Sequence, residues 1–161
     1  MYTHSVKTFW KAALVLIGVA IFHPIAEAAD APESFKVVDG VAIYLGVMPA
    51  QVIQGHPKEH LESEMHGGVP IKGHRDHVVV ALFDDATGKR IENAKVMGSV
   101  MELGLGGRKK KLEAMKIAGT ITYGNYFDML SKDTYHIKLW IRRPGVPGVV
   151  EAKFTHRHFS K

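Results

Sequence analysis

Short apolar runs separated by turn residues fill the chain from Val41 onward, and this pattern restricts the fold more than any other feature of the sequence. The clearest run is residues 134–142 (TYHIKLWIR), where Tyr135, Ile137, Leu139 and Ile141 alternate with His136, Lys138, Trp140 and Arg142. Because successive side chains of a β-strand point to opposite faces, this run predicts a strand with one face in the core. Further strands are expected at residues 41–47, 77–84, 94–103, 120–123, 126–130 and 149–159.

Turn signals between these runs indicate the class of fold. Residues 85–89 and 144–148 are turns by composition, and Gly124-Asn125 is expected to form a tight turn or bulge. Short strands with such signals every 8–12 residues or so are typical of an all-β, immunoglobulin-like antiparallel β-sandwich. Two stretches suggest a helix, residues 57–65 and residues 109–118, and the second is alternatively a loop.

The N-terminus has the order of a secretory signal peptide. Two lysines precede an uncharged apolar run of 11 residues, 12–22, and Ala26-Glu27-Ala28 offers the small residues that a signal peptidase reads. A membrane-spanning helix needs about 20 apolar residues, which leaves an uncleaved N-terminal anchor as the less favoured alternative. We therefore expect a signal peptide over 1–28 and a single β-sandwich domain over 29–161, located in a bacterial periplasm and not integral to the membrane after cleavage.

Composition excludes several classes of function. With 161 residues, the chain has the length of one domain. It has no cysteine, so disulfides, thiolate catalysis, iron–sulfur clusters and cysteine zinc sites are excluded. The formal charge of +5 is spread along the chain and does not indicate a nucleic-acid partner. We see no nucleophile–base pair and no pair of carboxylates in an apolar context, and therefore expect no enzyme.

Histidine and methionine, at 10 and 7 residues, are the residues that suggest a binding chemistry. His156 and His158 lie two apart in the last expected strand and therefore share a face. The start of one strand and the end of an antiparallel neighbour lie at the same pole of a sandwich, so His74 and His77 are expected to face them. A third group, His56, His60 and His66, lies in the first helical candidate and around it. His136, central on a strand, is interpreted as a structural residue.

These residue types match a copper site. Imidazole binds copper, zinc, nickel and iron, whereas the methionine thioether selects Cu(I). We expect a copper ion, with zinc as the alternative. The candidate ligands are His74, His77, His156, His158, Met101, Met115, His56, His60 and His66. The competing interpretation is that the histidines are surface or hydrogen-bonded residues and the methionines fill the core.

Three segments carry a resemblance to a known group of proteins. They are VALFDDATGKRIENAKV, YGNYFDM and TYHIKLWIRRPG, within residues 74–159. In these segments the chain resembles the small periplasmic YtkA-like and FixH-like domains of immunoglobulin type. The resemblance implies a secreted binding or accessory module, often associated with copper or with the assembly of membrane respiratory complexes. It departs from that group in the loop MELGLGGRKKKLEAM, which keeps only Met101 and Met115 of a methionine-rich loop.

Two functions follow from these observations. The first is a periplasmic metal-binding protein, with copper as the expected ion, that acts as a carrier, buffer or accessory factor. The alternative is a metal-free interaction module that docks a membrane or periplasmic protein partner through its sheet edges or its basic run. That run is Arg108-Lys109-Lys110-Lys111, which is expected to lie in solvent or to meet an anionic lipid or an acidic partner.

Overall fold

A computed structural model describes residues 33–54, 75–102, 105–117 and 119–159 of the chain. Its elements are β1 (Phe35–Val38), β2 (Val41–Pro49), α1 (Ala50–Gln54), β3 (Arg75–Asp84), β4 (Lys95–Glu102), β5 (Lys109–Ile117), β6 (Thr120–Asp128), β7 (Thr134–Arg142) and β8 (Val150–Arg157). The expected signal peptide, the helical candidate at residues 57–65 and the candidate ligands His56, His60, His66 and His74 lie outside the described residues. Within those residues, no helix has the length and apolar character needed to cross a bilayer.

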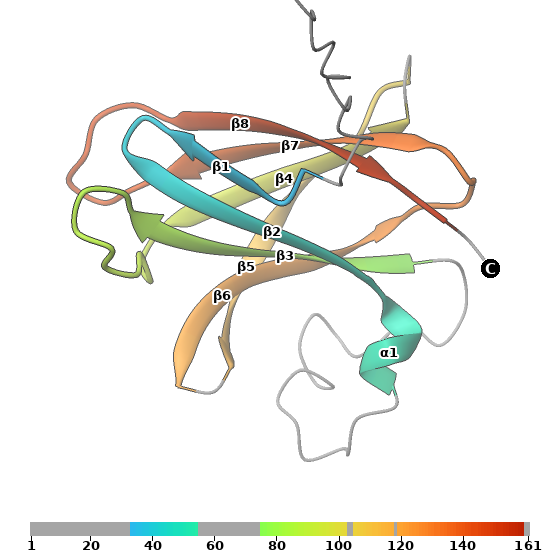
Figure 1. Cartoon of the computed structure of the whole chain (residues 1–161), viewed down its shortest axis with the longest axis horizontal. Helices are drawn as coiled ribbons and strands as arrows, with labels where there is room; N and C mark the ends of the chain where they lie inside the picture. The colour runs from blue at the N-terminus through green and yellow to red at the C-terminus, as the bar shows by residue number, and fades with distance from the viewer. Residues whose placement is uncertain (1–32, 55–74, 103–104, 118, 160–161) are drawn as a thin grey trace, which may run out of the picture.

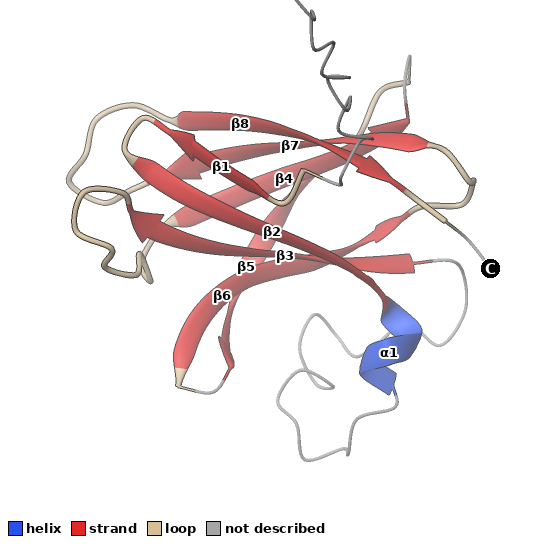
Figure 2. Ribbon diagram, in the orientation of Figure 1, coloured by secondary structure: helices blue, strands red, loops and turns tan. Residues whose placement is uncertain are grey.

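The eight strands form one antiparallel sheet that folds over into two layers (Figure 1). The strand order is β1-β2-β3-β6-β5-β4-β7-β8. β5 joins the layers, because residues 109–112 pair with β4 and residues 113–117 pair with β6. Figure 2 shows strand almost throughout, with α1 following the end of β2. The expected all-β antiparallel sandwich is confirmed, with the difference that a shared strand connects its two layers.

Alternation along the strands places the core between the layers, as the sequence predicts. On β7, Ile137, Leu139 and Ile141 are fully buried, while Lys138 is partly exposed on the other face. On β3, the even-numbered residues Val78, Val80 and Leu82 are fully buried in the same core cluster. The period of two residues therefore decides which side chains face inward on both layers.

Two local predictions are wrong. Residues 109–117 form a strand and not a helix, because Leu112 pairs with Val96 of β4 and enters the core. Gly124 and Asn125 are not a turn, since β6 continues through both and pairs with β3. The reason for a glycine in mid-strand appears on the outer face, where two side chains lie over Gly124.

Candidate metal centre

His77 and Met115 meet on the outer face of the layer formed by β2, β3, β6 and β5. His77 is one of the odd-numbered residues of β3, whose side chains point outward. Gly124 of β6 pairs with Val79, another of these residues, and therefore lies on the same outer face. An ideal Cβ built on Gly124 would lie 2.7 Å from Nε2 of His77 and 2.5 Å from Cε of Met115. A side chain at this position would displace the His77 ring or the end of the Met115 side chain. The imidazole and the thioether arm are therefore neighbours above Gly124.

Both side chains are buried although they point away from the sandwich core. His77 is 3% exposed and Met115 is 1% exposed. The His77 ring stacks on Tyr126, with ring centroids 4.7 Å apart and an interplanar angle of 28°. Tyr126 in turn packs with Ala50 at the start of α1. Stacking and burial hold the imidazole in one orientation.

A second methionine lies next to this pair. Met48 of β2 is the cross-strand partner of His77 and packs against the cluster of Ala50 and Tyr126. Residues paired across two strands present their side chains on the same face, so Met48 shares the outer face with His77. The sequence offered no periodic signal for Met48, because its relation to His77 depends on the pairing of β2 with β3.

The donor types of this cluster are those that a soft metal ion prefers. One imidazole nitrogen and one or two thioether sulfurs are ligands that select Cu(I), whereas Zn(II) is not bound preferentially by thioethers. Gly124 has no side chain, so the imidazole and the thioether arm both come close to its Cα. We name His77, Met115 and Met48 the His–Met cluster.

His156 and His158 lie in a different place, at the open end of the sandwich. They follow the buried residues Ala152 and Phe154 on the inner face of β8, as the spacing predicts. Nε2 of His158 lies 3.4 Å from a carboxylate oxygen of the buried Asp76. Its Nδ1 is 3.0 Å from the carbonyl oxygen of Ser131, which can only accept a hydrogen bond. Both ring nitrogens of His158 thus have protein neighbours, an arrangement that connects the residues directly after β8 to β3 and to the loop after β6.

The structure does not bring His77 to His156 and His158. Asp76, one residue earlier on β3, points inward and meets His158, whereas His77 points outward. Successive residues of a strand point to opposite faces. His77 therefore points away from His158, although both residues lie at the same end of the sandwich. Met101 pairs with His136 on the outer face of the other layer and is separated from Met115. Across the described residues, no three side chains of His, Asp and Glu form a group suited to a metal ion.

Acidification should destabilise the fold through His156. Burial holds the pKa of the His156 imidazole below its ordinary value of 6.5; the nearby His158 also lowers this pKa, and Asp76 opposes the shift. The unfolded chain therefore binds a proton at His156 more readily than the folded chain does. The contribution of the neutral His156 to the free energy of unfolding is present above about pH 6.5 and is lost as the pH falls below that value. Urea unfolding midpoints between about pH 7.5 and 5 measure the effect. His156→Gln should flatten the decline, and an unchanged slope would contradict this role.

Known proteins resemble this chain in structure and not in sequence. No protein-family model matches the sequence, and no curated protein matches it. A DUF4426 family protein from Pseudomonas aeruginosa has a TM-score of 0.59 at 17% identity, over 79% of this chain and 94% of that chain. FetP of uropathogenic Escherichia coli strain F11, expressed in the periplasm of E. coli, has a TM-score of 0.59 at 12% identity, over 79% and 93% of the two chains.

A third neighbour is the copper-reconstituted P19 protein of Campylobacter jejuni. It has a TM-score of 0.60 at 11% identity and covers 79% of this chain and 94% of that chain. FetP has also been crystallised as a copper-bound variant. At these identities the matches establish a shared β fold. They do not confirm the narrower resemblance to the YtkA-like and FixH-like domains.

Proposed function

We propose that this protein binds copper in the periplasm, as Cu(I) at His77 and Met115, and acts as a carrier, buffer or accessory factor. The observation that carries the proposal is the meeting of an imidazole nitrogen and a thioether arm over Gly124. Copper-bound structures of FetP and P19, which have a similar fold, support the choice of ion. Met48 is a candidate for a further sulfur ligand, because it is the cross-strand neighbour of His77.

Further features support this function over a catalytic one. The N-terminal sequence has the order of a secretory signal, and FetP was expressed in a periplasm. His77 and Met115 are enclosed, which suits retention and transfer of an ion more than reaction with a substrate. Binding should weaken as the solution is acidified, because a ligand histidine must be neutral.

A Cu(I) titration against a competing chelator, under anaerobic conditions, tests the proposal. His77→Gln should lower the affinity by at least about tenfold, since second-shell changes alone cost that much at metal sites. The matched control is His136→Gln, a partly buried histidine on the outer face of the other layer. A parallel Zn(II) titration establishes the preference between ions. Equal affinities of the two variants, or a protein that binds Zn(II) as tightly as Cu(I), would contradict the proposal.

A further inference from the structure

Cations cover the outer face of the layer formed by β4, β7, β8 and the first part of β5. Cross-strand pairing places them in three rows. The first row is Lys95 and Arg142. The second row is Lys109, Ser99, Lys138 and Lys153, and the third row includes Lys111, Met97 and Trp140. Arg157, paired with Thr134, extends the set along β8. We call this surface the basic face; its cations are Lys95, Lys109, Lys111, Lys138, Arg142, Lys153 and Arg157. All except the partly exposed Lys138 are exposed.

The centre of the basic face concentrates positive charge around one aromatic ring. Nζ of Lys109 lies 3.9 Å and Nζ of Lys138 lies 4.9 Å from the centroid of the Trp140 ring. Glu151 is the one acid in these rows among the described residues, and it already pairs with Lys138 at 2.7 Å. The hydrogen bond from Lys138 lowers the pKa of the Glu151 carboxyl, which therefore stays ionised at neutral pH. One acid against seven cations leaves the face strongly positive.

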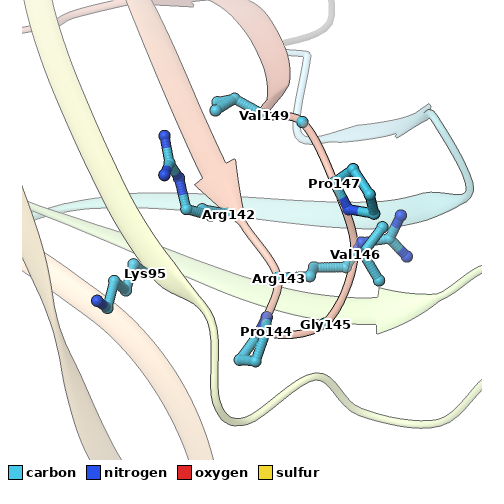
Figure 3. Close-up of a pocket in the computed structure, with 9 residues that line it drawn as sticks. Lys95, Arg142, Arg143, Pro144, Gly145, Val146, Pro147 and Val149 are labelled. Carbon is cyan, nitrogen blue, oxygen red and sulfur yellow. The ribbon is translucent and has the colours of Figure 1, made fainter.

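The cations do not converge on a single small ligand. A cavity of about 420 Å³ lies at one end of the face, between Lys95, Arg142, Arg143 and the turn at residues 144–149. Figure 3 shows the side chains of Lys95, Arg142 and Arg143 extending in different directions. A built anion site would aim its cations at one point. A spread of cations over four strands instead matches a partner whose negative charges are also spread over a surface.

We propose that the basic face docks on a phospholipid bilayer that contains anionic lipids. Charge complementarity carries the proposal, since each basic residue close to an anionic bilayer adds to the attraction. Lipid headgroups can move laterally to meet each lysine, whereas an acidic protein must present carboxylates at fixed matching positions. The His–Met cluster lies on the outer face of the opposite layer, so docking leaves it directed away from the bilayer. The inference does not depend on copper binding.

Co-sedimentation of the secreted protein with vesicles tests the docking. We expect binding to vesicles of phosphatidylcholine with about 30% phosphatidylglycerol, loss of binding when salt rises from about 0.1 to 0.5 M, and weak binding to pure phosphatidylcholine. Lys111→Glu with Lys153→Glu should weaken binding to the anionic vesicles by about thirtyfold or more. Binding to neutral vesicles measures the attraction that does not depend on anionic lipids.

The matched control is Lys89→Glu with Lys116→Glu, which changes the net charge equally at exposed lysines outside the basic face. It should retain most of the binding. If the glutamate pair on the basic face does not fold, Lys111→Gln with Lys153→Gln replaces it. Equal losses in the two pairs, or equal binding to neutral and anionic vesicles, would overturn the proposal. Binding to soluble polyglutamate without binding to vesicles would also overturn it, in favour of an acidic protein partner.

Discussion

Replacing Leu139 by alanine should lower the free energy of unfolding by about 2–5 kcal/mol. Leu139 is fully buried and lies between two small residues on the neighbouring strands, Gly98 and Ala152. Its Cδ2 is 3.5 Å from the position of a Cβ built on Gly98, so the leucine side chain fills space that neither neighbour occupies. Truncation therefore leaves a cavity that those neighbours cannot close. Urea unfolding of the wild type and the variant, with equal m-values, measures the loss.

Lys138→Ala is the control for this prediction. Lys138 is the adjacent residue on the opposite face of β7, and its ion pair with Glu151 is exposed to solvent. Exposed pairs of this kind contribute about 0–1 kcal/mol, so the midpoint should move little. A larger loss in Lys138→Ala than in Leu139→Ala would mean that the faces of β7 are reversed.

Much of the sandwich could be predicted because its strands have one buried and one exposed face. Alternation on β7 identified which side chains enter the core, and β3 has the same alternation of inward and outward residues. The same pattern failed for β5, where KKKLEAMKI is rich in residues that favour helices, and pairing with β4 and β6 overrides that preference. β1 was missed although Asp39-Gly40 marks it. Both residues have positive φ, as expected for the two-residue turn of a hairpin between Val38 and Val41.

The candidate metal centre could be predicted only in its residue types. Alternation places His77 on the outer face of β3, but it does not say which strand lies beside β3. Met115 comes near His77 because β6 pairs with β3 and β5 pairs with β6, an order that differs from the order in the sequence. Gly124 is the local signal that was misread. A glycine inside a strand often marks a bulge, a tight bend or a close approach, and here it marks the position of the His–Met cluster.

Met115→Leu should lower Cu(I) affinity by at least about tenfold while the fold is kept. Leucine has nearly the volume of methionine, and such exchanges cost less than about 1.5 kcal/mol of stability. The variant therefore removes the thioether without creating a large cavity at a fully buried position. A chelator-competition titration, with thermal unfolding as the check on folding, gives the result.

Met101→Leu is the matched control, because Met101 was also a candidate ligand but pairs with His136 on the other layer. Its Cu(I) affinity should equal that of the wild type. The reverse outcome, a loss in Met101→Leu and none in Met115→Leu, would move the site to the outer face of β4 and β7 and contradict the assignment.

X-ray absorption at the copper edge of the Cu(I)-loaded protein tests copper binding at His77 and Met115, because it identifies the atoms bound to the ion. We expect nitrogen and sulfur neighbours in the wild type, a reduced sulfur signal in Met115→Leu, and a reduced imidazole signal in His77→Gln. A wild-type spectrum with nitrogen and oxygen neighbours alone, or a sulfur signal that is unchanged in Met115→Leu, would contradict copper binding at His77 and Met115.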